Sequence, residues 1–214
     1  MRFTFLLLAS LAFCSTFGQK RIEKTGVDTR KYVPEGLELK SQAPTFGGFM
    51  TNGEKFDSRY AVREGNVVVL FIRGVWSEPC MALLEDVTQN LAAFNNENTK
   101  VVVITAEPGD RAKRLASVVS DELTILSDGN MQISKTFDVI YRLNAEGLAE
   151  VNTEIGMPFE EYYKSQQHFI PVTATYVIGQ NGYVMWKHFE FDASERPSAE
   201  EILDNLPLSA TKGK

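Results

Sequence analysis

One stretch of the chain, residues 66–95, constrains the fold more than any other. Residues 67–72 form an uninterrupted run of six apolar residues, which is typical of a strand that is buried on both faces of a sheet. After Cys80 the apolar residues recur at helical spacing, namely at Leu83, Leu84, Val87, Leu91 and Phe94. The stretch therefore predicts a buried strand, a short loop and an amphipathic helix that begins close to Cys80.

The loop that joins this strand to the helix carries several helix-start signals. Ser77 is a good N-cap residue, Glu78 suits the positive end of a helix, and Pro79 is tolerated in the first turn. Cys80 then falls near the third helical position, where free backbone N–H groups favour a thiolate. A strand that delivers one cysteine to a helix N-terminus is the arrangement that activates thiols for redox chemistry.

The same segment resembles a known family. Residues 73–80 read Arg-Gly-Val-Trp-Ser-Glu-Pro-Cys. This is similar to the Arg-Gly-x-Trp-Cys-Pro-x-Cys segment of peroxiredoxin-like proteins in the alkyl hydroperoxide reductase/thiol-specific antioxidant family, which have the thioredoxin fold. On the pattern Pro-x-x-x-Thr/Ser-x-x-Cys, Ser77 matches the hydroxyl position and Cys80 the peroxidatic cysteine, whereas Arg73 stands in place of the proline. The resemblance covers roughly residues 34–206.

This resemblance implies a fold and a chemistry. The fold would be one thioredoxin-like α/β domain over residues 34–207, with a central mixed sheet, helices on both faces and an N-terminal hairpin extension. The chemistry would be that of a thiol peroxidase. The Cys80 thiolate would attack hydrogen peroxide or an organic hydroperoxide, become a sulfenic acid, and be restored by a thioredoxin-like or low-molecular-weight thiol. Ser77 would hydrogen-bond the sulfur or the substrate oxygen, and Arg73 would stabilise the thiolate.

The later apolar segments complete such a fold. Residues 100–106 and 123–126 predict two further strands, and the strand–helix–strand order predicts a right-handed crossover with parallel pairing. Asn-Gly pairs at 52–53 and 181–182 predict two hairpin turns, because both residues tolerate positive φ. A final helix is expected over residues 197–206. The chain thus supplies both parallel and antiparallel strands to one sheet.

Two further features bear on the activity. Residues 144–169 correspond to an insertion in similar proteins, where a lid, a dimer contact and a cover for the sheet are all compatible with the pattern; we expect a cover and leave a homodimer open.

The position of Thr173 holds a cis-proline in thioredoxins and an arginine in typical peroxiredoxins. Because this chain has a threonine there, the position supplies no cation. Because a helix N-terminus lowers a thiol pKa by only about one unit, a strongly activated Cys80 needs a cation, and Arg73 is the nearest by sequence.

The chain begins with the features of a secretory signal peptide. Arg2 precedes an apolar run at residues 3–13, and Thr16 and Gly18 place small residues at positions −3 and −1 of a cleavage site. We expect residues 1–18 to be removed and the protein to be exported, to a bacterial periplasm. The apolar run is short for a membrane span, and no later segment qualifies as one.

Removal of the signal would change the cysteine content and the charge. Cys14 would leave with it, since lipidation of Cys14 fits poorly after the bulky Phe13, and Cys80 would be the only thiol. A polar lead-in at 19–33 and a flexible tail at 208–214 would flank the domain. With one arginine and no acid removed, 21 basic and 28 acidic residues give a net charge of −7. That charge argues against nucleic acid or an anionic membrane surface as a partner.

Other chemistries fit the residues less well. A Cys-His hydrolase would need a histidine near Cys80, but His168 and His188 lie in no recognisable motif, and one cysteine with two scattered histidines gives no metal-ligand spacing. No glycine-rich phosphate loop is present, so we expect no cofactor. Two alternatives remain open: a redox-inert thioredoxin-fold binding protein, and a disulfide oxidoreductase, which would need a second thiol where Ser77 stands.

Overall fold

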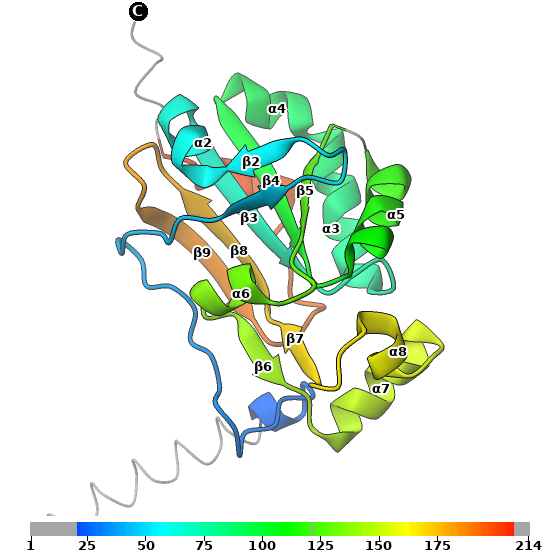
Figure 1. The fold of residues 1–214 in the computed structure, drawn as a ribbon. Helices are drawn as coiled ribbons and strands as arrows, with labels where there is room; N and C mark the ends of the chain where they lie inside the picture. The colour runs from blue at the N-terminus through cyan, green and yellow to red at the C-terminus, as the bar shows by residue number, and fades with distance from the viewer. Residues whose placement is uncertain (1–20, 121, 208–214) are drawn as a thin grey trace, which may run out of the picture.

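The computed structural model describes residues 21–120 and 122–207 of the 214-residue chain, so the expected signal peptide, its cleavage site and the expected tail at 208–214 lie outside the described residues. A five-stranded mixed sheet forms its centre (Figure 1). In sheet order its strands are β5 (Thr124–Ser127), β4 (Thr99–Thr105), β3 (Asn66–Ile72), β8 (Thr173–Ile178) and β9 (Val184–Glu190). The predicted central mixed sheet is therefore confirmed.

Strand β3 lies in the middle of this sheet, and all seven of its residues are buried. It pairs in parallel with β4 along its whole length and antiparallel with β8 on its other side. The crossover from β3 to β4 runs through α3 (Glu78–Gln89) and α4 (Leu91–Asn96). The doubly buried strand and the helix after it are both present, and a short loop joins them. The predicted helical run through Leu91 and Phe94 is divided at Asn90 into α3 and α4.

The two faces of the sheet are covered by two separate hydrophobic clusters, into which the side chains of β3 alternate. Val68, Leu70 and Ile72 pack against α3, α5 (Gly109–Val119) and α9 (Ala199–Asp204). Val67, Val69 and Phe71 pack on the other face. That face is covered by the hairpin of β1 (Gly47–Phe49) and β2 (Lys55–Asp57), by α2 (Ser58–Glu64) and by residues around α6 (Gln132–Thr136). This alternation explains why β3 reads as a continuous apolar run.

The predicted hairpin turns are both present. The Asn-Gly pair at 52–53 joins β1 to β2, and the pair at 181–182 joins β8 to β9. Gly53 and Gly182 have φ values of 88° and 78°, which is the left-handed region that glycine adopts without steric cost. Both turns therefore form where their sequence predicts, but only the glycine of each pair has a positive φ, and Asn52 and Asn181 do not.

Residues 144–169 form a compact helical segment. It contains α7 (Ala145–Ile155) and α8 (Phe159–Tyr163), between the antiparallel strands β6 (Ile140–Arg142) and β7 (Phe169–Pro171). Figure 1 shows α7 and α8 together near the end of the sheet where β3 and β4 finish. In the described part of the chain, no helix is long and apolar enough to cross a membrane.

The aromatic cluster on the hairpin side of the sheet yields a prediction for stability. Phe137 is fully buried, and its ring centroid lies 5.1–5.6 Å from those of Phe46, Phe71 and Tyr176. Phe137→Ala should lower the free energy of unfolding by about 3–5 kcal/mol, because it leaves a cavity among these rings. Phe49→Ala, at a side chain that is 74% exposed, is the matched control and should change it by less than about 0.5 kcal/mol. Urea unfolding measures both, and equal effects would contradict the packing described.

Candidate functional site

Cys80 occupies the third residue of α3, as its sequence position predicts, and its side chain is completely buried. The loop before it is folded tightly: the Ser77 N–H donates to the Gly74 carbonyl at 3.2 Å, and the Met81 N–H donates to the Ser77 carbonyl at 3.0 Å. Ser77 is the N-cap by position, but its side chain makes no capping hydrogen bond. Its hydroxyl is therefore not committed to the helix end.

An arginine contacts the thiol directly. Nη2 of Arg196 lies 2.6 Å from the Cys80 Sγ, and Nε of the same side chain donates to the Ala193 carbonyl at 3.2 Å. Arg196 comes from the loop between β9 and α9, 116 positions along the chain from Cys80. Burial lowers the pKa of Arg196, whereas the neighbouring thiol raises it. The contact places a cationic donor against the sulfur, which favours the thiolate.

Arg73, the cation expected from the sequence, is anchored to other groups. Its Nη2 donates to the Tyr141 hydroxyl at 2.8 Å and to the Phe191 carbonyl at 3.1 Å. Burial opposes its charge, but Tyr141, Cys80 and further groups together raise the pKa of Arg73. Arg73 therefore adds positive charge near Cys80, while the cation in direct contact is Arg196. Arg73 is the nearest cation by sequence, but sequence distance does not report which loop folds back over α3 and brings Arg196 to the sulfur.

No carboxylate of the described residues lies within 4.0 Å of either guanidinium as an ion-pair partner. Nε of Arg73 and Nη1 of Arg196 are moreover buried without a hydrogen-bond partner in this part of the chain. Burying a charge is costly unless an opposite charge compensates it. Glu154, Asp192 and Cys80 all interact electrostatically with Arg73, whereas the Cys80 sulfur is the group in direct contact with Arg196.

Thr173 does not supply a further cation, as its type predicts. It is fully buried at the start of β8, and its hydroxyl donates to the Glu190 carbonyl of β9 at 3.2 Å. The histidines take no part in the site either. His168 contacts Glu160 of α8, and His188 lies opposite Thr175 in the β8–β9 pair. Across residues 21–120 and 122–207, no group of three side chains could hold a metal ion.

A cavity of about 300 Å³ lies beside the thiol loop. Arg73, Ser77 and Pro79 line it on one side, and Glu150 and Glu154 of α7 line it on another. The cavity gives a small molecule access to Arg73 and Ser77, whereas Cys80 and Arg196 do not line it. It contains both positive and negative groups, so it suits a polar molecule of modest size.

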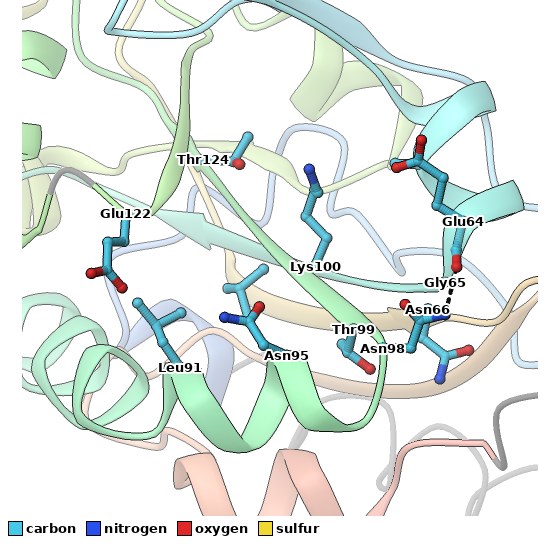
Figure 2. Close-up of a pocket in the computed structure, with 12 residues that line it drawn as sticks. Glu64, Gly65, Asn66, Leu91, Asn95, Asn98, Thr99, Lys100, Glu122 and Thr124 are labelled. Carbon is cyan, nitrogen blue, oxygen red and sulfur yellow. Dashed lines mark hydrogen bonds between the residues drawn. The ribbon is translucent and has the colours of Figure 1, made fainter. Parts of the chain in front are cut away.

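A second cavity, of about 240 Å³, lies at the opposite end of the sheet (Figure 2). Asn66 and Thr99, the first residues of β3 and β4, line it together with Lys100 and Glu122. Because Cys80 follows the last residue of β3, the two cavities are separated by the length of that strand. The cavity in Figure 2 therefore does not belong to the thiol site.

A buried carboxyl group, Glu107, lies behind the thiol loop. Its Oε1 accepts hydrogen bonds from the Val75 N–H at 3.2 Å and from the Tyr162 hydroxyl, and the Thr105 hydroxyl donates to its Oε2 at 3.4 Å. Burial raises the pKa of Glu107, and these hydrogen bonds oppose the rise. Burial outweighs these hydrogen bonds, so the pKa of Glu107 lies above its ordinary value.

Comparisons with known proteins place this geometry in context. The sequence model of the AhpC/TSA family matches residues 39–187. This range includes Arg73, Ser77 and Cys80 but not Arg196. No curated protein matches the chain in sequence. Among solved structures, reduced Prx3 of Vibrio vulnificus in complex with hydrogen peroxide is similar, with a TM-score of 0.62 and 12% identity over 80% of this chain and 99% of that one.

Two further solved structures are similar in fold. Peroxidoxin BcpB of Mycobacterium tuberculosis has a TM-score of 0.60 and 17% identity over 79% of this chain and 96% of that one. A yeast mitochondrial 1-Cys peroxiredoxin has a TM-score of 0.58 and 13% identity over 78% of this chain and 73% of that one. At these identities the structural likeness establishes the thioredoxin fold expected from the sequence. The family match is a separate finding, and its range includes the thiol loop at residues 73–80.

The arginine contact predicts how readily the thiol reacts. Arg196→Met removes the charge in contact with Cys80 while keeping much of the packing of the side-chain stem, so the rate of alkylation by iodoacetamide at pH 7 should fall by about tenfold or more. Arg73→Met, the matched control, removes a nearby charge without a direct contact and should lower the rate only about threefold. The pH profile of alkylation should move to higher pH in both variants. An Arg196→Met profile that superimposes on that of the parent would contradict the role given to this contact.

The buried Glu107 predicts a pH dependence of stability. Its pKa lies above the ordinary 4.5 in the folded protein, so the unfolded chain releases this proton first as the pH rises. The contribution of Glu107 to stability therefore decreases with rising pH between the unfolded and folded pKa values. Glu107→Gln lacks this titration, so the difference in unfolding free energy between variant and parent should move in the variant's favour from about pH 4 to about pH 7. Urea unfolding across this range tests it, and a constant difference would count against a raised pKa.

Proposed function

Because the chain belongs to the AhpC/TSA family, we propose that it is a thiol-dependent peroxidase that uses Cys80 as its nucleophile. The observation that carries this proposal is the 2.6 Å contact between the buried Cys80 Sγ and Nη2 of Arg196 at the N-terminus of α3. Helix N-terminus and guanidinium both favour the thiolate, which is the reactive form of cysteine. An inert structural cysteine gains nothing from two buried arginines.

The reaction follows from this arrangement. The Cys80 thiolate attacks one oxygen of the hydroperoxide; an S–O bond forms, the O–O bond breaks, and the leaving oxygen departs as an alkoxide or hydroxide that takes up a proton. The products are a Cys80 sulfenic acid and an alcohol or water. Negative charge moves from the sulfur to the leaving oxygen, and Arg196 and Arg73 can stabilise it there. The Ser77 hydroxyl, which makes no helix-capping hydrogen bond, is proposed to hydrogen-bond the sulfur or the peroxide oxygen.

Restoration of the thiol needs a reductant from outside the domain. Cys80 is the free cysteine of the described residues, so an external thiol would attack the sulfenic acid and release water to give a mixed disulfide. A second external thiol would then free Cys80 and leave as the external disulfide. The yeast protein of similar fold is described as a 1-Cys peroxiredoxin whose thiol is resolved by glutathione/thioredoxin systems, which supports such a scheme by analogy. The sulfur must be uncovered in this step, because it is buried at rest.

Hydrogen peroxide and small organic hydroperoxides are the substrates that we propose, and the cavity of about 300 Å³ beside Arg73 and Ser77 supports this choice. A redox-inert binding protein and a disulfide oxidoreductase are not favoured. A redox-inert binding protein would not account for the buried Cys80–Arg196 contact. A disulfide oxidoreductase would need a second thiol at the position of Ser77. Export directed by residues 1–18 is likewise a proposal, and N-terminal sequencing of the mature protein would test it.

The nucleophile is tested by substitution. Cys80→Ser should abolish peroxide consumption in the presence of a thiol reductant, because a serine hydroxyl is not ionised near neutral pH, while the unfolding transition should remain cooperative. Treatment of residues 19–214, which lack Cys14, with peroxide and a sulfenic-acid trap should label one site, Cys80. The trap, rather than a gain of oxygen mass, is the readout, because this part of the chain also contains five oxidisable methionines. Undiminished peroxide consumption by Cys80→Ser would disprove the assignment.

A further inference from the structure

The last two tyrosines of α8 are joined to the thiol loop by hydrogen bonds. The Tyr163 hydroxyl donates to the backbone carbonyl of Arg73 at 2.9 Å and accepts a hydrogen bond from Nε1 of Trp76, also at 2.9 Å. Burial raises the pKa of Tyr163, so the hydroxyl keeps the proton that it donates. One tyrosine thus bridges the two ends of the four-residue segment 73–76.

Tyr162 reaches the middle of the same segment through Glu107. Its hydroxyl donates to Oε1 of Glu107, and this oxygen also accepts the Val75 N–H at 3.2 Å. The guanidinium of Arg111 lies 3.8 Å from the centroid of the Tyr162 ring, which is within the range of a cation–π interaction. This interaction helps to fix the position of the ring. Both tyrosines are at most 4% exposed, so their hydroxyl groups would have few other partners.

The loop fits closely against this support. A Cβ atom at Gly74 would lie 2.6–2.9 Å from the side chain of Glu107, and Gly74 has a φ of 154°. The tyrosines are fixed in turn by ring contacts, with centroids 4.4 Å apart for Phe159 and Tyr163 and 5.1 Å apart for Tyr162 and Tyr163. A segment held at Arg73, Val75 and Trp76 by a packed aromatic group has little freedom to move.

Arg73 is consequently held at both of its ends. The Tyr163 hydroxyl donates to the backbone carbonyl of Arg73. At the other end of the residue, the Tyr141 hydroxyl of β6 accepts a hydrogen bond from the guanidinium at 2.8 Å. The same loop determines where α3 begins, since the Ser77 N–H donates to the Gly74 carbonyl. A displacement of the loop would therefore shift both a cation near Cys80 and the helix N-terminus that carries it.

We propose that Tyr162 and Tyr163 are positioning residues that act through residues 73–76 to hold Arg73 and the start of α3 in place around Cys80. Residues 144–169 would then serve the thiol site and not only cover the sheet. The inference rests on the proposed role of Cys80 as nucleophile. Its test uses alkylation and amide exchange, neither of which needs peroxide, so failure of the peroxidase assay and failure of the positioning role can be told apart.

The primary test is Tyr163→Phe, which keeps the ring and removes both hydrogen bonds. Amide hydrogen exchange at Val75 and Ser77 should become about three- to tenfold faster, as expected for the loss of a hydrogen bond. The alkylation rate of Cys80 at pH 7 should fall about threefold, with the pH profile moved to higher pH. Tyr183→Phe, at a tyrosine that is 42% exposed on the β8–β9 turn, is the matched control and should change neither quantity.

A double-mutant cycle then tests whether Tyr163 acts through Arg73. If it does, Tyr163→Phe combined with Arg73→Met should slow alkylation about threefold, like either single variant, and not about ninefold. Tyr162→Phe, which loosens Val75 through Glu107, should reproduce the faster amide exchange and covers the case in which Tyr163→Phe folds poorly. Unchanged exchange and alkylation in both tyrosine variants would overturn the proposal. Independent, multiplicative effects in the cycle would overturn the route through the Arg73 guanidinium.

Discussion

The interaction on which this site depends is the buried contact between a guanidinium and a thiol. Arg196 lies 2.6 Å from the Cys80 sulfur, and neither Arg196 nor Arg73 has a carboxylate within 4.0 Å among the described residues. Removing a positive charge from water costs several kcal/mol unless a negative charge compensates it. A thiolate at Cys80, the reactive form that we propose, would satisfy that requirement at Arg196. The electrostatics proposed to make the cysteine nucleophilic would therefore also make the buried guanidinium in contact with it tolerable.

The fold brings this pair together from distant parts of the chain. Strand β3, buried on both faces, fixes the position at which the loop to α3 begins, and the parallel pairing with β4 fixes its direction. The loop after β9 carries Arg196 back over the N-terminus of α3, where α9 packs into the same hydrophobic cluster. The rigid sheet thus supplies the frame, and two connecting loops supply the chemical groups, a common division of roles in α/β proteins.

The helical segment of α7 and α8 adds a third contribution. Its aromatic side chains belong to the hydrophobic cluster on the hairpin side of the sheet, yet two of its hydroxyl groups are bonded to the thiol loop and to Glu107. Packing and positioning are therefore performed by the same residues. Such an arrangement makes the geometry around Cys80 depend on the order of a segment that contains no reacting group, because buried hydrogen bonds transmit small displacements of packed elements.

The sequence by itself determined most of the elements, and it put forward Cys80 as the candidate nucleophile. The apolar run of β3, the N-cap position of Ser77 and the two Asn-Gly turns are local signals, and each forms where its pattern predicts. The helical spacing after Cys80 also forms helix, although Asn90 divides it into α3 and α4. The cation in contact with the sulfur was decided only by the tertiary structure. Arg196 lies 116 residues from Cys80, beyond the segment that matches the family, in a loop without periodicity, so no local pattern marks it. Long-range contacts between loops depend on how the sheet and helices pack, and that information is not contained in the spacing of neighbouring residues.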